Sequence, residues 1–357
     1  MNRKFLSLFL FIVLAAPTFG QADDSTSTDK PLGNWVTTAQ VEARVDWQRD
    51  WLDGTKRANE SGFRGQYINF VLKGELGKHW NYAYRQRFSK EIKSGFFNAT
   101  DWLYLTYNIK KWEMSAGKQV VGVGGFEYDY APIDVYQYSE YCNNIGCYQF
   151  GASVAYNLTP NDRLQVQATQ SPFRANADDM YGFGVKWDGK HGPFTALYST
   201  NLFEATPGHW INYIALGNRL DFNHGHFIVD WTNRYAGGYD ANFFGDFTIT
   251  TELHVQPIRE LNAFVKYGWD RNKENGSDYC VFAGTEQHHL GGGVEYFPLK
   301  GRRDLRLHAS YFHTWGENTN PAGVLQDKES TLNIGITFRA DLLNIKKLKL
   351  RRTPSGA

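Results

Sequence analysis

Apolar and polar side chains alternate along residues 35–48, and this alternation constrains the fold more than any other feature of the chain. One parity of the segment carries Trp35, Thr37, Ala39, Val41, Ala43, Val45 and Trp47. The other parity carries Gln40, Glu42, Arg44, Asp46 and Gln48. Because successive side chains of a strand point to opposite faces, we expect a strand with one apolar and one polar face.

The same pattern recurs along the chain and predicts about sixteen strands. The further segments are 68–76, 80–88, 103–109, 112–116, 148–158, 164–170, 180–187, 194–202, 210–222, 227–235, 247–255, 261–269, 287–297, 305–315 and 331–338. Short connections are expected at 77–78, 110–111, 159–162, 188–192, 223–225, 257–259 and 298–304. Longer polar connections are expected at 52–62, 91–98, 121–146, 171–179, 203–209, 236–245, 270–286 and 316–329.

This alternation of connection lengths is typical of bacterial outer-membrane barrels, which have short periplasmic turns and longer extracellular loops. The predicted fold is therefore all-β, a transmembrane antiparallel β-barrel of about 16 strands. In such a barrel the apolar face contacts outer-membrane lipid and the polar face lines water.

The composition agrees with a barrel better than with a soluble core. Aromatic residues make up 16% of the 357 residues, yet the mean hydropathy is −0.50, and the aromatics are interleaved with polar residues instead of forming apolar runs. Several Trp residues fall near the ends of predicted strands, where amphipathic rings favour the membrane–water interface. The net charge of +1 gives no electrostatic footprint for nucleic acid.

The first 22 residues have the features of a secretory signal peptide. Arg3 and Lys4 precede an apolar stretch, Phe5 to Ala16, and small residues follow it. An anchoring helix is the alternative, but a membrane span needs about 20 apolar residues. The expected organisation is a signal peptide at 1–22, a periplasmic lead-in at 23–33, a barrel at 34–340 and a basic tail at 341–357.

The cysteines allow one short disulfide. Cys142 and Cys147 are separated by four residues, so a bridge between them would close a small loop, while Cys280 is left over. Zinc binding is the alternative, although no His or second Cys pair lies nearby. Neither a phosphate-binding Lys motif nor a nucleophile motif is present. We expect no enzyme activity, no cofactor and no metal.

The longest connection, 121–146, is expected to fold inward and narrow the channel that a sixteen-stranded barrel leaves open. It follows Gly117-Lys118-Gln119 and contains the run Gly-Phe-Glu-Tyr-Asp-Tyr-Ala-Pro-Ile-Asp-Val-Tyr-Gln-Tyr-Ser at 125–139. Over about residues 115–140 the chain resembles Bacteroidetes-type porins of the phosphate-selective porin O and P family. The resemblance implies a passive, trimeric diffusion channel in the outer membrane.

Charged residues on the predicted inward face suggest where the pore narrows. Arg44, Arg85 and Arg87 should share one wall, and the loop carries Glu127, Asp129 and Asp134. An inward loop would set these acids against the bases, and a transverse field would orient solutes in the gap. The alternative is that the acids pin the loop to the wall by salt bridges. Inward acids and bases nearly balance, whereas a dedicated anion pore should show an excess of Arg or Lys.

The predicted function is therefore that of a porin in a Gram-negative outer membrane. It would pass small hydrophilic solutes and ions, with anions such as phosphate among the candidates. Its partners would be outer-membrane lipid, the diffusing solutes and two further copies in a homotrimer. The alternatives are a closed barrel that acts as a binding protein or adhesin, and a barrel-embedded hydrolase with Ser, His and an acid at one rim.

Overall fold

The computed structural model describes residues 36–89, 95–173, 179–236, 243–321 and 325–344. Its strands are β1 (Val36–Leu52), β2 (Thr55–Lys56), β3 (Gly62–Leu76), β4 (Trp80–Arg87), β5 (Thr100–Ile109), β6 (Trp112–Val120), β7 (Tyr148–Thr159), β8 (Asp162–Gln170), β9 (Tyr181–His191), β10 (Phe194–Thr206), β11 (His209–Phe222), β12 (Gly225–Ala236), β13 (Asp246–Ile258), β14 (Leu261–Asn272), β15 (Glu286–Tyr296), β16 (Leu305–Glu317) and β17 (Glu329–Asn344). The helical turns are η1 (Ala58–Glu60), α2 (Phe126–Asp129), η3 (Pro132–Asp134) and α3 (Glu140–Asn144).

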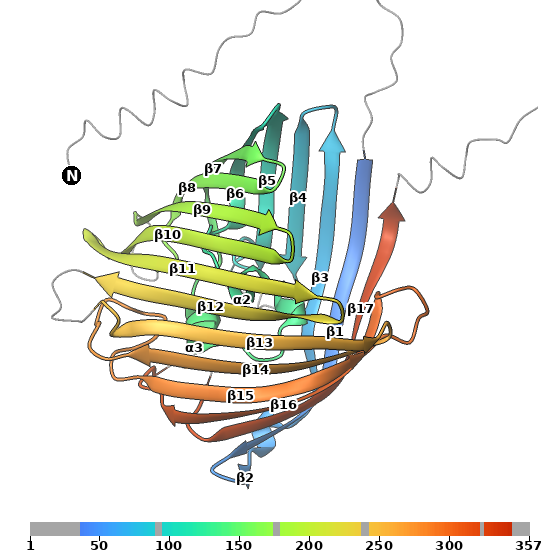
Figure 1. Ribbon diagram of the computed structural model, residues 1–357, viewed down its shortest axis with the longest axis vertical. Coiled ribbons are helices and arrows are strands. Elements are labelled where there is room, and N and C mark those ends of the chain that lie inside the picture. Colours follow the sequence, from blue (N-terminus) through green and yellow to red (C-terminus); the bar gives the residue numbers. More distant parts are fainter. Residues whose placement is uncertain (1–35, 90–94, 174–178, 237–242, 322–324, 345–357) are drawn as a thin grey trace, which may run out of the picture. The chain divides into compact units, whose positions relative to one another are not determined.

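Sixteen of the strands in the described chain close into one antiparallel barrel. From β3 to β17 each strand pairs with the next, and β1 pairs with both β3 and β17, so the ring has no free edge. The remaining strand, β2, is a two-residue addition to β1 in the first loop. Figure 1 shows the ring of strands with α2 and α3 behind its front wall. The prediction of a barrel with about sixteen strands is confirmed.

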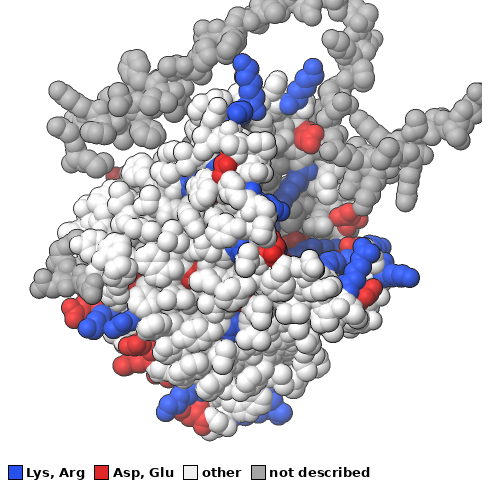
Figure 2. Space-filling model, viewed as in Figure 1, with Lys and Arg blue, Asp and Glu red and all other residues white. Residues whose placement is uncertain are grey.

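The two faces of the wall have opposite chemistry, as the alternation predicts. Val45 and Leu105, which have 43% and 47% of their surface exposed, belong to the large set of apolar side chains on the outside. Their neighbours along the strands, such as Arg44 and Asp46, are buried inside. In Figure 2 the middle of the visible wall is largely free of charge, while Lys, Arg, Asp and Glu gather near its ends. An apolar band between charged rims is the surface that a lipid bilayer requires.

Aromatic pairs mark the turn end of the barrel. Trp80 at the start of β4 lies against Tyr107, with ring centroids 4.9 Å apart, and Trp112 at the start of β6 lies against Tyr156 at 4.6 Å. Both tryptophans are exposed on the outer surface. They form part of the interfacial girdle that amphipathic rings make at a membrane boundary.

Several predicted boundaries differ from the structure, including those at residues 203–209 and at the end of the barrel. Residues 203–209 are not a long loop, because β10 runs to Thr206 and a two-residue turn leads into β11. Phe203 and Ala205 continue the strand with buried, inward side chains. At the other end, β17 extends to Asn344, four residues beyond the predicted barrel, and pairs there with Thr38 of β1.

The predicted signal peptide, the lead-in and the tail from residue 345 onward lie outside the described residues. Within the described ranges, no helix has the length and apolar character needed to cross a membrane.

Candidate functional site

The connection between β6 and β7, residues 121–147, lies inside the barrel against the wall formed by β10 to β12. The Gly124 N–H donates to Ser199 Oγ at 2.8 Å, and the Gly125 N–H donates to the Leu197 carbonyl at 3.1 Å. A Cβ added at Gly124 would lie 2.4 Å from the Leu197 oxygen, so a larger residue could not approach the strand this closely. The Gly-rich segment therefore brings the loop backbone onto the wall.

Apolar side chains fix this part of the loop. Val121, Val123, Tyr141 and Ile145 are buried in a cluster that also includes inward side chains of β10 and β11. Its wall members are Phe203, Ala205, Ile211, Tyr213, Ala215 and Ala236, and the β14–β15 loop adds Cys280 and Val281. We call this the interior cluster. The barrel thus carries a small hydrophobic core on the inside of one wall, where a polar lining was expected.

Glu127 anchors the loop by a buried ion pair. Its carboxylate accepts a hydrogen bond from Lys266 Nζ at 2.7 Å, and Lys266 also lies 3.0 Å from Glu252 on β13. The Ser139 N–H and hydroxyl donate to the same carboxylate at 2.8 Å and 2.6 Å. Burial raises the pKa of Glu127, but the Lys266 ammonium and these hydrogen bonds outweigh it and leave the pKa below its ordinary value of 4.5.

Asp134 anchors the far side of the loop. It forms ion pairs with Arg306 at 3.0 Å and with Arg339 at 2.7 Å, on β16 and β17. Arg44 on β1 donates to the carbonyl of Val135 at 2.8 Å and pairs with Asp46 on its own strand at 2.8 Å. Arg44 therefore holds the loop backbone, and it does not face a loop carboxylate.

Two wall acids bind the N–H groups of the loop helices. Asp230 on β12 accepts from the Glu127 N–H at 2.7 Å. Asp270 on β14 accepts from the N–H groups of Glu140 at 2.8 Å and Tyr141 at 3.3 Å. These donors lie at the starts of α2 and α3, where backbone N–H groups have no partner within the helix. The wall thus supplies the missing acceptors.

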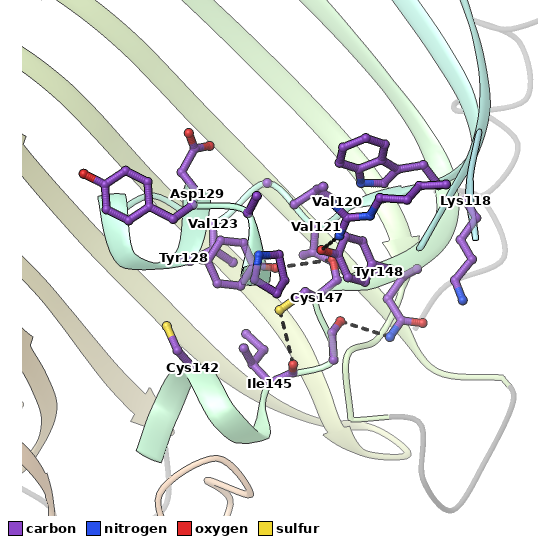
Figure 3. A pocket seen from close by; sticks show the side chains of 18 of the residues that line it. Lys118, Val120, Val121, Val123, Tyr128, Asp129, Cys142, Ile145, Cys147 and Tyr148 are labelled. Atoms are coloured by element: carbon purple, nitrogen blue, oxygen red, sulfur yellow. Dashed lines mark hydrogen bonds between the residues drawn. The ribbon is translucent and has the colours of Figure 1, made fainter. Parts of the chain in front are cut away.

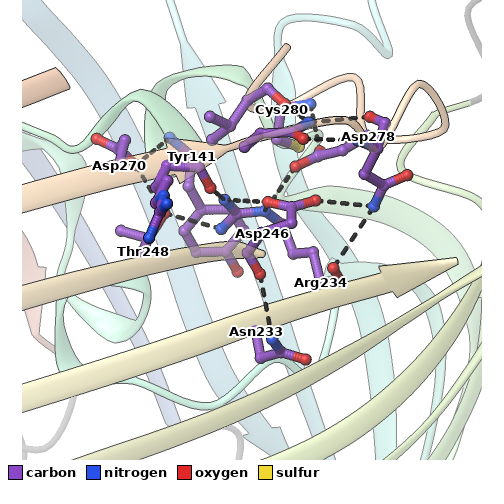
Figure 4. A network of polar contacts seen from close by, with 12 residues as sticks. Tyr141, Asn233, Arg234, Asp246, Thr248, Asp270, Asp278 and Cys280 are labelled. Carbon is purple, nitrogen blue, oxygen red and sulfur yellow. Dashed lines mark hydrogen bonds and ion pairs between the residues drawn. The ribbon is translucent and has the colours of Figure 1, made fainter. Parts of the chain in front are cut away.

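A second buried network joins the β14–β15 loop to the same region (Figure 4). Arg234 on β12 lies 2.7 Å from Asp246 and 2.6 Å from Asp278, and it donates to Thr248 Oγ1 at 2.8 Å. The Thr248 hydroxyl in turn donates to Asp270. Because Asp270 also binds α3, one hydrogen-bonded chain connects both inward loops to the wall.

An open space remains between the loop and the opposite wall. A cavity of about 640 Å³, here called the outer chamber, is lined by inward residues of β3 to β9 and by the exposed side of the loop (Figure 3). Its charged lining includes Arg85, Arg87, Asp129 and Lys186. Arg87 is the last residue of β4 and Tyr148 the first of β7, so the chamber reaches toward the long-loop end.

A basic cluster of Lys73, Arg85 and Arg87 lies on the strand wall, and its two arginines line this chamber. Arg85 and Arg87 both pair with Asp101, at 2.9 Å and 3.0 Å. Lys73 Nζ lies 4.5 Å from the centre of the Trp102 ring, and the Arg85 guanidinium lies 4.2 Å from it. The two guanidinium groups share the single carboxylate of Asp101, and the Lys73 ammonium lies on the same Trp102 ring, so bases outnumber Asp101 at this position.

A second cavity of about 250 Å³, the inner chamber, lies toward the short-turn end. His226 and Arg306, each the second residue of its strand, contribute to its lining. The lining bases Arg219, Lys266 and Arg306 are matched by the acids Asp134, Glu252 and Glu295. The inner chamber therefore lacks the positive excess of the basic cluster.

The predicted arrangement of bases facing acids is not what the structure shows. Arg85 and Arg87 pair with Asp101, while Asp129 pairs with Lys186 at 3.3 Å and has 54% of its side chain exposed. Glu127 and Asp134 follow the alternative, because their salt bridges pin the loop to the wall. The reason is the path of the loop, which lies along β10 to β17 and away from β4.

The predicted disulfide is not formed, because Cys142 and Cys147 are free thiols. Cys142 lies within α3 and is buried in the interior cluster, and burial raises its pKa well above the ordinary value. The Cys147 thiol donates to the Ile145 carbonyl at 3.4 Å (Figure 3). Both cysteines thus lie at the interior cluster without a bond between their sulfur atoms.

Sequence reasoning placed Lys266, Arg306, Arg339, Asp230 and Asp270 on the inward face but did not assign them to the loop. Their inward parity was the available signal, whereas their loop partners depend on the fold. Trp102 and Lys186 were missed. Among the described residues, no group of three His, Cys, Asp or Glu side chains is arranged to hold a metal ion.

Comparisons with known proteins agree with this architecture. Residues 39–206 match the family model described as phosphate-selective porin O and P. A search of curated proteins found no match. The anion-selective porin from Comamonas acidovorans is similar in fold, with a TM-score of 0.63 and 12% identity over 86% of this chain and 100% of that chain.

Two further solved structures have the same fold. The outer membrane channel DcaP of Acinetobacter baumannii has a TM-score of 0.59 and 13% identity over 88% of this chain and 100% of that chain. The trimer form of in-vitro folded OmpT from Vibrio cholerae has a TM-score of 0.57 and 12% identity over 87% of this chain and 100% of that chain. By its match over residues 39–206 and its closed barrel, this chain is similar to the phosphate-selective porin O and P family, has the fold of the porins compared above, and is placed in the Gram-negative outer membrane.

Proposed function

We propose that the protein is a passive, non-enzymatic channel for small hydrophilic solutes and ions that passes anions, phosphate among them, in preference to cations. The observation that carries the preference is the basic cluster, in which Arg85 and Arg87 share the carboxylate of Asp101 and Lys73 lies on the Trp102 ring beside Arg85. Rings of Arg or Lys favour anions in a pore because they lower the electrostatic energy of an anion that passes them.

The position of the remaining charges supports this proposal. The wall acids Asp230 and Asp270 bind N–H groups of the inward loop, and the loop acids Glu127 and Asp134 are paired with wall bases. A carboxylate that is already paired with a cation adds little net field in the channel. The near balance of charges in the sequence therefore does not extend to the outer chamber.

The test is the reversal potential of the purified protein in a planar bilayer under a salt gradient. The wild type should give steady open steps and a potential whose sign reports anion preference. The double substitution Lys73→Gln with Arg87→Gln should shift this potential toward cations, whereas Lys78→Gln, in a turn outside the lumen, should leave it unchanged. A cation-selective wild type would overturn the anion preference. A folded barrel without conductance would favour the closed binding protein.

We also propose that the protein is exported with a signal peptide at 1–22 and assembles as a homotrimer. The charged and apolar segments of residues 1–22 support export. The trimer form recorded for OmpT supports the assembly, because the two barrels share a fold. Mass spectrometry of the mature N-terminus and light scattering of the detergent-solubilised protein test the two statements separately.

A further inference from the structure

The two chambers extend toward different ends of the barrel and have a single lining residue in common. The outer chamber reaches Arg87 and Tyr148 at the long-loop ends of their strands, and the inner chamber reaches His226 and Arg306 at the turn ends. Of the residues that line them, Tyr130 is shared. A solute that moves directly from one chamber to the other passes beside Tyr130.

The Tyr130 side chain is held in place at this junction. Its backbone N–H donates to the Phe126 carbonyl at 3.0 Å and closes α2. Its ring packs against Phe126, Leu197 and Ile228, which form a small apolar cluster on the wall. A ring fixed on its backbone and packed on one face narrows a passage without depending on a mobile hinge.

The chambers on either side of Tyr130 differ in charge. The basic cluster lies beside the outer chamber, while acids and bases are matched in the inner chamber. Burial raises the pKa of the Tyr130 phenol above its ordinary value, so the side chain adds no charge at neutral pH. The sign of a solute would thus be selected before the junction, and the junction itself would act on solute size.

We propose that Tyr130 is the size-determining residue of the permeation path, at the neck between the outer and inner chambers. This inference rests on the proposed channel function and names the position at which that channel is narrowest. Charge selection and size selection are then carried by different residues, the basic cluster and Tyr130.

Single-channel conductance and the exclusion of polyethylene glycols of graded size test the proposal. Tyr130→Ala should raise the conductance roughly twofold or more and admit larger polymers, because pore diameter limits the flow. Tyr130→Trp should lower the conductance. Tyr130→Phe should match the wild type, because the ring and not the hydroxyl narrows the path.

Tyr104→Ala is the matched control. Tyr104 lies between the outward Leu103 and Leu105 on β5, so its side chain points inward, yet it lines neither chamber. Its removal should leave the conductance and polymer cut-off unchanged.

Folding of each variant is checked by its heat-dependent mobility in gels. If folded Tyr130→Ala and Tyr130→Trp both conduct as the wild type does, solutes bypass Tyr130 and the inference fails while the channel stands. If the folded wild type does not conduct, the proposed function fails first.

Discussion

At the scale of single residues, the ion pair between Lys266 and Glu127 determines whether the loop stays on its wall. Lys266→Met would leave Glu127 and Glu252 buried without their shared cation. Removing one partner of a buried pair costs about 3–5 kcal/mol, because the remaining charge stays uncompensated. Urea unfolding of this variant in detergent should therefore show a large loss of stability. In planar bilayers, its open-channel current should be noisier than that of the wild type.

Lys186→Met is the control for this substitution. Lys186 pairs with Asp129, whose side chain is half exposed, and such pairs contribute at most about 1 kcal/mol. Equal stability losses in the two variants would mean that the loop is not held by Lys266.

Two acids of the same loop should respond to pH in opposite ways. Burial raises the pKa of Glu140 above 4.5, so its contribution to stability is present below pH 4.5 and is lost as the pH rises through the raised value. Glu140→Gln should therefore gain stability over the wild type as the pH rises toward neutral. The measurement is the urea midpoint across this range.

The contribution of Glu127 to stability should change with pH in the opposite direction to that of Glu140. Its pKa lies below 4.5, so its contribution is present above pH 4.5 and is lost as the pH falls through the lowered value. Glu127→Gln should lose stability relative to the wild type as the pH rises. Parallel pH profiles for the two variants would contradict both assignments.

At the scale of elements, the close approach of the loop to β11 depends on a glycine. A Cβ at Gly217 would lie 2.6 Å from Gly125 Cα and 2.9 Å from its nitrogen. Gly217→Ala should therefore push the loop off the wall and destabilise the protein by about 1–3 kcal/mol, as overpacking does. Gly65→Ala, whose added Cβ meets nothing within 4 Å, should be neutral in thermal unfolding and conductance.

The strands could be predicted from the sequence because alternation is a local property of each segment. The prediction was wrong at 203–209, where Phe203 and Ala205 are apolar on the inward face because they pack in the interior cluster. There the contrast between faces that reveals a strand is lost. The partners of Glu127 and Asp134 could not be predicted either, because Lys266 and Arg306 are distant in sequence and meet the loop only after the barrel closes.

At the scale of the whole molecule, anion preference should depend on ionic strength. The basic cluster acts on solutes through a field that salt screens, with a Debye length of about 10 Å at 0.1 M and about 3 Å at 1 M. The permeability ratio from reversal potentials should therefore fall toward unity as the mean salt concentration rises. An unchanged ratio would indicate selection by direct contact with a bound anion instead of by the field.

The interior cluster limits which substitutions the β10 to β12 wall tolerates, whereas the opposite wall is less restricted. Side chains on β10 to β12 serve both as wall and as core for the loop, so most changes there alter folding as well as permeation. The side chains of β3 to β9 that line the outer chamber face open space beside the loop. Substitutions on β3 to β9 alone could therefore change which solute the channel passes. A library of variants confined to that wall is the economical route to engineered selectivity.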